Sequence, residues 1–321
     1  MSNVHSKPKV ACNRIPPHVR SFREILKSFT EADYVEWDYS DVLDMIKEYD
    51  AIVTHVSVPI DAKTIYRAKN LKVIATPSTG TDHIDIKAAL ERNIHVISIK
   101  DDIEFLDNIT STAELAFGLI ICLLRNIPWS FESVKSGKWD SSLFRGHMLS
   151  GKSLGIIGAG RLGKMMCKYG NAFRMRVLAY DPYVKINMAN VEQVDLDSLL
   201  AGSDIVSVHV HLNDETRAMI GKRELSIMKP NAILINTSRG AVIDENALVE
   251  ALQDGKIAGA AVDVLTDELS GNINKSPLVN YARENRSVII TPHIGGVTYE
   301  AQELAYGRTA EKMLEWFKRN W

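Results

Sequence analysis

Short apolar runs alternate with amphipathic stretches along almost the whole chain. Such a run, bounded by polar residues, is typical of a strand buried on both faces of a parallel sheet, and the stretches between are typical of the helices that cover it. In the first half, the runs predict strands at Lys9–Cys12, Tyr34–Trp37, Ala51–His55, Lys72–Thr76 and His95–Ile99. Helical periodicity separates them at Phe22–Phe29, Val42–Lys47, Ala62–Ala68 and Ile84–Glu91.

The same alternation continues in the second half of the chain. The strands predicted there are Leu154–Ile157, Arg176–Tyr180, Asp204–Val210, Ala232–Asn236, Gly259–Val264 and Val288–Thr291. Six strands joined by helices match one complete doubly wound sheet. The pattern therefore predicts an α/β protein with two doubly wound parallel-sheet domains.

A polar run at residues 107–111 separates the two halves. It precedes a long apolar helix predicted over Thr112–Leu124, which opens the second domain. The last segment, Thr298–Trp321, has apolar residues at helical spacing but no sheet of its own on which to bury them. We therefore expect this segment to return to the first sheet. The predicted domains are residues 1–110 with 296–321, which is discontinuous, and residues 111–295.

Composition narrows the class of protein. A chain of 321 residues, 45% hydrophobic and 24% charged, is long enough for two domains with separate cores. Its net charge of −2 gives no reason to expect nucleic acid or an anionic membrane as a partner. The apolar stretch Leu115–Leu124 is too short to span a bilayer, and residues 1–7 lack an apolar signal core. Three cysteines, Cys12, Cys122 and Cys167, lie far apart without metal-ligand spacing, which predicts reduced thiols in a cytoplasmic protein and no metal site.

A glycine-rich fingerprint, GxGxxG, is present at Gly158-Ala159-Gly160-Arg161-Leu162-Gly163. It follows a predicted strand and opens a predicted helix over Leu162–Phe173, the context in which such a loop binds a dinucleotide. Gly158 would allow the tight turn, Gly160 the approach of a pyrophosphate, and Gly163 close packing of helix on sheet. The diphosphate would lie at the helix N-terminus, where the helix dipole favours negative charge.

Asp181 ends the next predicted strand, eighteen residues after Gly163. An acidic residue in that place accepts hydrogen bonds from the hydroxyls of the adenosine ribose and repels a 2′-phosphate. The second domain is therefore predicted to be a Rossmann domain that binds NAD in preference to NADP. The alternative interpretation is an ordinary α/β turn followed by a surface aspartate.

Further motifs follow later strands of the second domain, at the sheet edge where open α/β folds build their sites. They are Ile235-Asn236-Thr237-Ser238-Arg239-Gly240, the segment Ala261–Glu268 with Asp263 and Glu268, and Thr291-Pro292-His293-Ile294-Gly295-Gly296. Taken with the glycine fingerprint and Asp181, their order resembles the D-isomer-specific 2-hydroxyacid dehydrogenases. The resemblance extends over roughly Lys72–Gly296 and includes Ser78–Asp85, Thr112–Glu114 and Met228–Pro230.

This resemblance and elementary chemistry assign the same roles to three residues. Arg239 is suited to bind a substrate carboxylate and carbonyl, because its planar guanidinium stays charged. His293 is suited to give or take a proton at a developing alkoxide. Glu268 would hydrogen-bond the other imidazole nitrogen, orient the ring and favour its protonated form. The alternative interpretation is that Arg239 is an ordinary surface arginine and that His293 lies in an ordinary turn.

The resemblance also implies a reaction, an oligomeric state and further binding residues. It implies hydride transfer between NAD and a 2-keto or D-2-hydroxy acid in a cleft between the domains, in a homodimer formed through the cofactor domains near Thr112–Leu124 and Trp129–Phe144. Asp263 would hold the nicotinamide carboxamide. Other cofactor-binding residues would be Gly158, Gly160, Arg161, Leu162, Gly163, Asp181, His209, Thr216, Thr237 and Gly295. Backbone N–H groups of Ser78, Thr79 and Gly80 would bind the substrate carboxylate.

The chain departs from the family pattern in its first half and at one cofactor loop. Phosphoglycerate-acting members usually place an Arg-Ser pair after the third strand, where this chain has Val53–Ser57; Arg14 or Lys100 could replace that arginine. An acidic insertion at Lys100–Phe105 disfavours a highly anionic substrate. His211 stands where the family usually has a proline.

Other functions stay open from the sequence. D-3-phosphoglycerate dehydrogenase is the enzymatic alternative, and a formate dehydrogenase is disfavoured because those members typically carry Gln where Glu268 stands. An alternative of another class is a binding protein that senses NAD(H), like the transcriptional corepressors that share this fold. Turnover of NADH with 2-keto acids separates the enzymatic functions from that one.

Overall fold

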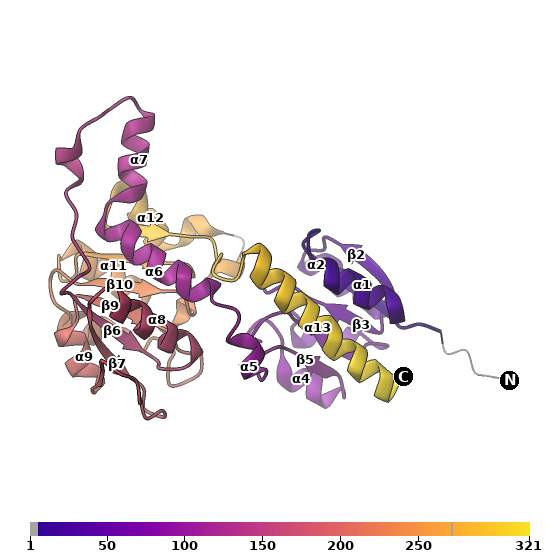
Figure 1. The fold of residues 1–321 in the computed structure, drawn as a ribbon. Helices are drawn as coiled ribbons and strands as arrows, with labels where there is room; N and C mark the ends of the chain where they lie inside the picture. The colour runs from indigo at the N-terminus through magenta and orange to yellow at the C-terminus, as the bar shows by residue number, and fades with distance from the viewer. Residues whose placement is uncertain (1–5, 271) are drawn as a thin grey trace. The chain divides into compact units, whose positions relative to one another are not determined.

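The computed structural model describes residues 6–270 and 272–321. Across these described residues the chain forms two compact units (Figure 1), Met1–Ile109 with Val297–Trp321, and Thr110–Gly296. Each unit is built on one parallel sheet, so the prediction of two parallel-sheet α/β domains is confirmed.

The sheet of the first unit has five strands within the described residues, in the order β2-β1-β3-β4-β5. Their bounds are β1 Lys9–Asn13, β2 Glu31–Val35, β3 Ala51–Val53, β4 Val73–Ala75 and β5 His95–Ile97. The register of β1 pairs Val10 with Ala51 of β3, and all neighbours run parallel. The prediction of a strand at Tyr34–Trp37 was wrong by three residues at its start. The edge strand β2 is mostly exposed, so it carries no apolar run that would mark it.

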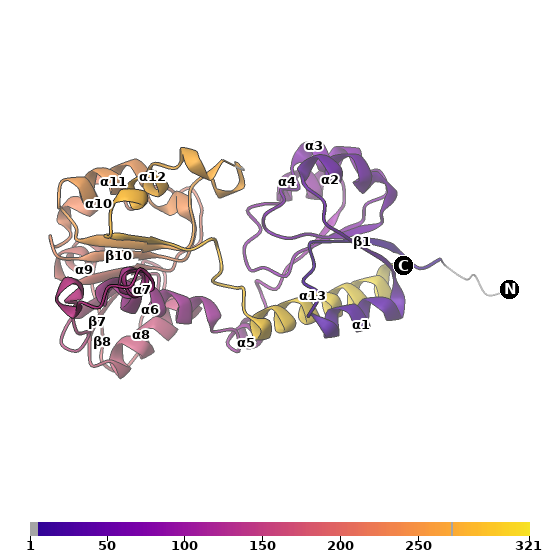
Figure 2. The same ribbon diagram turned by 90° about the horizontal axis from the view of Figure 1, so that it is seen from above.

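Helices cover both faces of this sheet. On one face α1 (Arg20–Phe29) lies beside α13 (Tyr299–Asn320), and on the other lie α2 (Tyr39–Met45), α3 (Ala62–Arg67) and α4 (Ile86–Glu91), as Figure 2 shows. The core under α1 and α13 joins sheet residues to side chains that are distant in sequence, among them Val10, Cys12, Phe22, Leu26, Tyr306, Met313 and Phe317. The C-terminal helix thus buries its apolar face on the first sheet.

The acidic insertion is tied to this C-terminal helix. It overlaps the short helix α5 (Ile103–Leu106), and Asp102 just before this helix accepts hydrogen bonds from Arg308 Nε at 3.1 Å and Lys312 Nζ at 3.2 Å. Burial alone would raise the pKa of Asp102, but these two cations outweigh burial and hold that pKa below its ordinary value. The insertion therefore carries less free negative charge than its sequence suggests.

The second unit is built on a seven-stranded sheet, counted over the described residues, in the order β12-β11-β10-β9-β6-β7-β8. The strands are β6 Ser153–Ile157, β7 Arg176–Tyr180, β8 Val191–Gln193, β9 Ile205–Val208, β10 Ile233–Asn236, β11 Gly259–Val262 and β12 Val288–Ile290. The sequence predicted six of these and missed β8. That edge strand pairs only with β7 and has partly buried and exposed residues, so the chain shows no apolar run there.

Helices also cover both faces of the second sheet. Figure 2 shows α6 (Ser111–Leu124) and α8 (Arg161–Ala172) on one side, and α10 (Lys222–Ile227), α11 (Glu245–Gln253) and α12 (Pro277–Glu284) on the other, where α9 (Leu196–Gly202) also packs on the sheet. Single-turn helices lie at Ile46–Glu48, Ser141–Phe144, Gly240–Val242, Glu268–Ser270 and Ile273–Lys275.

Helix α6 is apolar on almost every side, as a buried core helix is. The stretch Ile103–Leu124, which joins α5 to α6, is long and apolar enough to cross a membrane by length and composition, and 50% of the window that passes this test is buried inside the protein. Because α6 supplies one of the two cores of its unit, packing inside the protein accounts for its composition.

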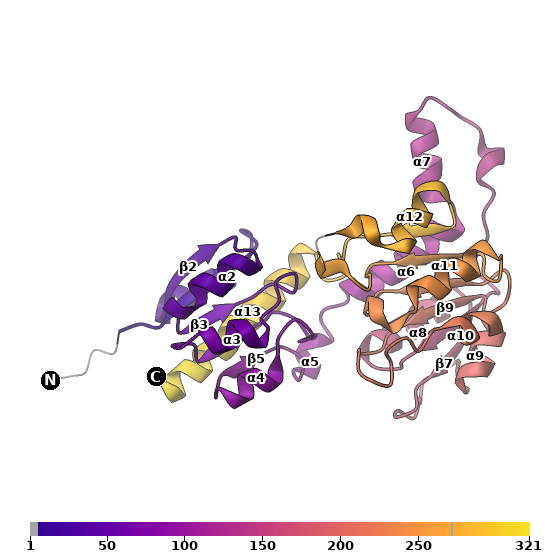
Figure 3. The ribbon, with the colours of Figure 1, turned by 180° about the vertical axis from the view of Figure 1, so that it is seen from behind.

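Helix α7 (Ile127–Lys135) and the following segment project from the second unit as an arm (Figure 3). None of the residues of α7 is buried. In the isolated chain, the arm exposes large apolar side chains to solvent, among them Phe131, Val134, Trp139, Leu143 and Met148.

Candidate active site

The glycine fingerprint forms the turn from β6 into α8. Gly158 has φ +91°, a conformation that side chains rarely adopt, and a Cβ there would lie 2.5 Å from the carbonyl oxygen of His209. A Cβ on Gly163 would lie 2.0 Å from the carbonyl oxygen of Gly158. Both positions therefore require glycine, one for the turn and the other for the approach of helix to loop.

The N-terminus of α8 is open to a ligand. Gly160 is its N-cap and has no side chain to cap the first turn, whose backbone N–H groups have no acceptor inside the helix. A Cβ built on Gly160 would meet no atom within 4 Å, so there is space over this residue. The next residues of the fingerprint, Arg161 and Leu162, form the first turn of α8. This arrangement fits a bound pyrophosphate.

Asp181 follows β7 and braces the glycine loop. Its Oδ2 accepts a hydrogen bond from the N–H of Ala159 at 2.8 Å, and its Oδ1 accepts from the N–H groups of Tyr183 and Val184 at 2.9 and 3.0 Å. A carboxylate has about four acceptor positions, so about one position on Oδ2 is left for a ribose hydroxyl. The sequence did not reveal the bracing role, because it depends on the fold of the loop.

The loop after β9 contains His209 and Thr216. His209 Nε2 lies 2.8 Å from Ser207 Oγ, and burial lowers the pKa of His209 to about 4, so this histidine is neutral near pH 7. Thr216 Oγ1 donates to the carbonyl oxygen of His211 at 2.6 Å and accepts from the N–H of Asn213 at 2.9 Å. Thr216 therefore fixes the shape of its own loop, including the unusual His211.

Arg239 lies in the loop after β10. Its Nη1 donates to the carbonyl oxygen of Ser238 at 2.8 Å. The neighbouring Thr237 is buried, and its Oγ1 belongs to the few buried polar atoms without a hydrogen-bond partner among the described residues. A buried hydroxyl of this kind is a group that a bound ligand can satisfy.

His293 and Glu268 form a hydrogen-bonded pair after the two neighbouring strands β12 and β11. His293 Nδ1 lies 2.8 Å from Glu268 Oε1, and both side chains are partly exposed, at 34% and 25%. Glu268 Oε2 also accepts from the N–H of Leu265 at 3.3 Å. His293 has φ +55°, a left-handed conformation that is uncommon for a residue with a side chain and that the surrounding structure must hold.

Asp263 holds the loop that carries His293. It is 1% exposed, its Oδ1 accepts from the Thr291 hydroxyl and from the N–H of Ile294, and its Oδ2 accepts from the N–H of Gly295 at 2.7 Å. Its main-chain carbonyl oxygen accepts from the N–H of His293 at 2.9 Å. These bonds explain how the left-handed conformation of His293 is maintained. Sequence reasoning expected only a cofactor contact for Asp263.

The structure brings the loops of Arg239, Glu268 and His293 to the same edge of one sheet, because β10, β11 and β12 are neighbours and parallel. The loops also touch: a Cβ on Gly240 would lie 2.0 Å from the carbonyl carbon of Leu265. A charged guanidinium on the same sheet edge as a histidine–carboxylate pair can bind an anion, and the pair can move a proton.

The predicted substrate loop lies in the first unit. Ser78, Thr79 and Gly80 follow β4, and Ser78 Oγ accepts from the N–H of Gly80 at 3.1 Å. In this conformation the Gly80 N–H group is engaged within its own loop. Arg14, a candidate phosphate ligand, donates from Nε to the carbonyl oxygen of Trp37 at 3.1 Å.

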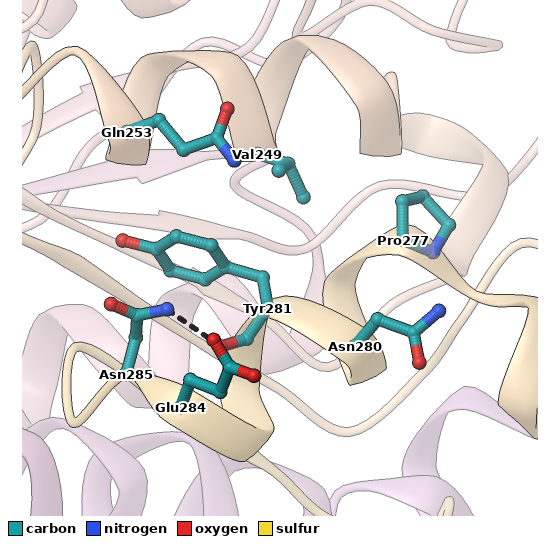
Figure 4. Close-up of a pocket in the computed structure, with 7 residues that line it drawn as sticks. All are labelled: Val249, Gln253, Pro277, Asn280, Tyr281, Glu284 and Asn285. Carbon is teal, nitrogen blue, oxygen red and sulfur yellow. Dashed lines mark hydrogen bonds between the residues drawn. The ribbon is translucent and has the colours of Figure 1, made fainter.

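A hollow of about 550 Å³ lies elsewhere in the second unit, between α11 and α12 (Figure 4). Its lining residues are Val249, Gln253, Pro277, Asn280, Tyr281, Glu284 and Asn285. None of them is a predicted site residue. In the part of the chain that the structure describes, no group of three His, Cys, Asp or Glu side chains could hold a metal ion.

A dinucleotide cofactor fits the second unit. The glycine loop leaves space over Gly160, Asp181 stands at the next strand end, and Thr237 offers a buried unpaired hydroxyl. Together with the histidine–carboxylate pair and the arginine on the same sheet edge, these features define the class as an NAD-dependent oxidoreductase.

Comparisons with known proteins specify this class further. A family model described as "D-isomer specific 2-hydroxyacid dehydrogenase, NAD binding domain" matches residues 117–295. The chain is 41% identical to a glyoxylate reductase of Thermococcus litoralis, over 82% of this chain and 78% of that protein. It is 36% identical to a hydroxypyruvate reductase of Thermotoga maritima, over 88% and 89%.

Two further similarities agree. A D-3-phosphoglycerate dehydrogenase of Methanocaldococcus jannaschii is 39% identical over 85% of this chain, which spans only 51% of that protein. The solved structure of D-lactate dehydrogenase from Aquifex aeolicus, complexed with NAD and lactic acid, has a TM-score of 0.83 and 30% identity, and covers 97% of this chain and 96% of its own. The chain belongs to the D-isomer-specific 2-hydroxyacid dehydrogenase family. The predictions of this family and of NAD as cofactor are confirmed.

Proposed function

We propose that this protein interconverts a 2-keto acid and a D-2-hydroxy acid, with Arg239, Glu268 and His293 as its catalytic residues. The observation that carries the proposal is the 2.8 Å hydrogen bond between His293 and Glu268, on the sheet edge that also presents Arg239. NAD, when bound, supplies or accepts the hydride. The protein itself must bind the substrate carboxylate, deliver a proton to the carbonyl oxygen, exclude water and orient the substrate.

The proton is moved at one nitrogen of His293. Because Nδ1 bonds to a carboxylate, which only accepts, Nδ1 carries a hydrogen and Nε2 is the atom that gives or takes a proton. In the reducing direction Nε2 donates to the substrate oxygen as it becomes a hydroxyl. Arg239 binds the carboxylate through its guanidinium and stabilises negative charge on that oxygen. Glu268 keeps the ring in the orientation and tautomer that this transfer needs.

The remaining site residues divide between the two units. In residues 111–295, we assign the pyrophosphate to Gly158–Gly163, the adenosine ribose to Asp181, and the rest of the cofactor to His209, Thr216, Thr237, Asp263 and Gly295. Asp181 supports a preference for NAD over NADP, because its charge would repel a 2′-phosphate. Residues 1–110 with 296–321 would bind the substrate through Ser78, Thr79 and Gly80, after the Ser78 side chain releases the N–H of Gly80.

A small, singly charged keto acid such as glyoxylate or hydroxypyruvate is the substrate class that we favour. Relatives named for both activities cover most of this chain. D-3-phosphoglycerate is less favoured, because Arg14, a candidate ligand for its phosphate, donates from Nε to the Trp37 carbonyl oxygen. Two other cations of the first unit, Arg308 and Lys312, are paired with Asp102.

We also infer a cytoplasmic homodimer that binds neither nucleic acid nor membrane. The arm after α6 supports the dimer: Trp139 is 90% exposed in the isolated chain, and Phe131, Leu143 and Met148 are exposed beside it in the sequence. So many large apolar groups on one projecting arm are typical of a surface that a second copy covers. Light scattering of the wild type and of Trp139→Asp tests this: a monomeric wild type contradicts the dimer.

The test of the activity is consumption of NADH with a panel of 2-keto acids that includes glyoxylate, hydroxypyruvate, pyruvate and 3-phosphohydroxypyruvate. We expect reduction of at least one of the unphosphorylated acids, and formation of the D-hydroxy acid on chiral analysis. If NADH binds but no acid is reduced above background, the alternative of an NAD(H)-sensing binding protein is favoured. If only the phosphorylated acid is reduced, the chain acts as a phosphoglycerate dehydrogenase.

A further inference from the structure

Asn236 is a buried polar residue with an unusual environment. It is the last residue of β10, its side chain is 1% exposed, and the residues before it on the strand, Ile233, Leu234 and Ile235, are apolar and buried. Burial of an amide costs free energy unless its hydrogen bonds are restored. The hydrogen-bond partners of the Asn236 side chain therefore indicate its role.

All the hydrogen bonds of the Asn236 side chain go to the loop of Arg239. Nδ2 donates to the carbonyl oxygen of Arg239 at 2.9 Å, while Oδ1 accepts from the N–H of Ser238 at 2.9 Å and from its hydroxyl at 2.6 Å. The orientation of the amide is fixed by these partners, since a backbone N–H can only donate and a carbonyl can only accept. The side chain thus ties both Ser238 and Arg239 to the end of β10.

The main chain around Asn236 extends this network. Its carbonyl oxygen accepts from the N–H of Asp263 at 2.9 Å, and the Arg239 carbonyl oxygen also accepts from the N–H of Val242 at 3.2 Å. Gly240 then packs directly on Leu265, whose N–H bonds to Glu268. The Arg239 loop is therefore held from the strand side by Asn236 and lies against the loop of Glu268 on the other side.

We propose that Asn236 is a positioning residue for Arg239: it aims the guanidinium at the substrate by fixing the carbonyl of Arg239 and the backbone of Ser238. This inference rests on the proposed role of Arg239 as the carboxylate-binding residue. An apolar residue of similar size would fill the same space, but it would leave the loop free to rotate the arginine away. Asn236 touches neither substrate nor cofactor in this proposal, and it acts only through Arg239.

The experiment is a double-mutant cycle between Asn236→Ala and Arg239→Lys, with kcat/KM for the best keto acid and the NADH dissociation constant as readouts. In the wild-type background we expect Asn236→Ala to lower kcat/KM by about 10- to 100-fold, mainly through KM for the keto acid, as misplacement of a binding group does. In the Arg239→Lys background the same change should cost less than about threefold, because lysine has no planar fork to orient. NADH binding should stay within about twofold in every variant.

Two controls keep this test decisive. Ser203→Ala removes another buried side-chain hydrogen bond from the same unit, to the carbonyl oxygen of Leu199 before β9, and should leave kcat/KM unchanged. Ser238→Ala removes only the hydroxyl donor to Asn236 Oδ1 and should lower kcat/KM by about two- to fivefold, which serves if Asn236→Ala does not fold.

Equal losses in both backgrounds, or a loss of NADH affinity that matches the loss of kcat/KM, would show a merely structural role and overturn the proposal. So would a fully active Asn236→Ala variant. If the wild type reduces no keto acid, the proposed function fails instead. If Arg239→Lys alone leaves kcat/KM unchanged, the assigned role of Arg239 fails.

Discussion

The two sheets of this protein share a parallel, doubly wound architecture but use their carboxyl edges differently. On the second sheet, the buried side chains of Asn236 and Asp263 hold the loops that carry Arg239 and His293. On the first sheet, the loops after β3 and β4 have short-range hydrogen bonds between neighbouring residues, as His55 Nδ1 has with Ser57 and Ser78 Oγ with the N–H of Gly80.

We infer from this difference that the second sheet holds the reactive groups and that the first sheet adapts to the substrate. A strand-end loop anchored by a buried polar side chain holds a reactive group within a narrow range of positions, which catalysis needs. A loop whose polar groups bond locally can exchange those bonds for bonds to a ligand at little cost. We therefore expect mutations on the second sheet to change kcat, and mutations on the first to change KM and substrate choice.

The largest effect is expected from His293→Ala. Loss of the proton donor should lower kcat by about 10²- to 10⁴-fold while the NADH dissociation constant stays nearly the same. His55→Ala, two residues after β3 in the first unit, is the matched control and should keep kcat within about threefold. Steady-state kinetics and NADH fluorescence measure both. Parallel loss of kcat and NADH affinity in His293→Ala would mean that the residue is structural.

Gly158→Ala should be the next most harmful change. Its φ of +91° and the 2.5 Å approach of His209 combine strain with a backbone clash, so we expect the free energy of unfolding to fall by about 1–3 kcal/mol and NADH affinity by about tenfold. Gly137→Ala is the control for strain alone, since φ there is +81° but no atom lies within 4 Å of the added Cβ. Thermal melts and NADH titrations compare the two. Equal effects would show that the clash contributes nothing.

Asp181→Ala should change cofactor preference by about tenfold, because it removes the charge that repels a 2′-phosphate. It also removes the bond to the N–H of Ala159, so NADH affinity should fall while NADPH affinity rises. The ratio of kcat/KM for the two cofactors is the measurement. A wild type that already prefers NADPH would refute the assignment of Asp181.

The sequence predicted most of both sheets, and its failures have a physical pattern. Strands that are buried on both faces are continuous apolar runs, whereas the edge strands β2 and β8 are largely exposed and carry no such signal. These two edge strands were therefore misplaced or missed, whereas the edge strands β5 and β12 were predicted.

The sequence could predict those residues of the candidate site that are chemically reactive and lie just after a predicted strand. Arg239, Glu268 and His293 could be proposed in that way, and the structure adds the contact between His293 and Glu268. The supporting roles of Asn236 and Asp263 could not be found, because a buried amide or carboxylate at a strand end looks the same in sequence whether it bonds to a ligand or to its own loop.

The smallest predicted effect concerns the first unit alone. Because the pKa of Asp102 is lower in the folded chain than in the unfolded chain, its contribution to stability is fully present above the ordinary aspartate range and is lost as the pH falls toward its folded value. Asp102→Asn should lower the free energy of unfolding by about 1–2 kcal/mol at neutral pH and make less difference in acid. Asp101→Asn, an exposed neighbour, is the control. Denaturant melts at several pH values test this, and a loss that grows in acid would contradict it.

The attachment of Asp102 to the C-terminal helix has a consequence for anyone who recombines members of this family. The insertion is not a modular loop: its carboxylate is neutralised by Arg308 and Lys312, more than 200 positions away in the sequence. A hybrid that inherits the insertion without this helix would receive an uncompensated, partly buried negative charge. Crossover points should therefore keep the two segments from the same parent, although they lie far apart in the coding sequence.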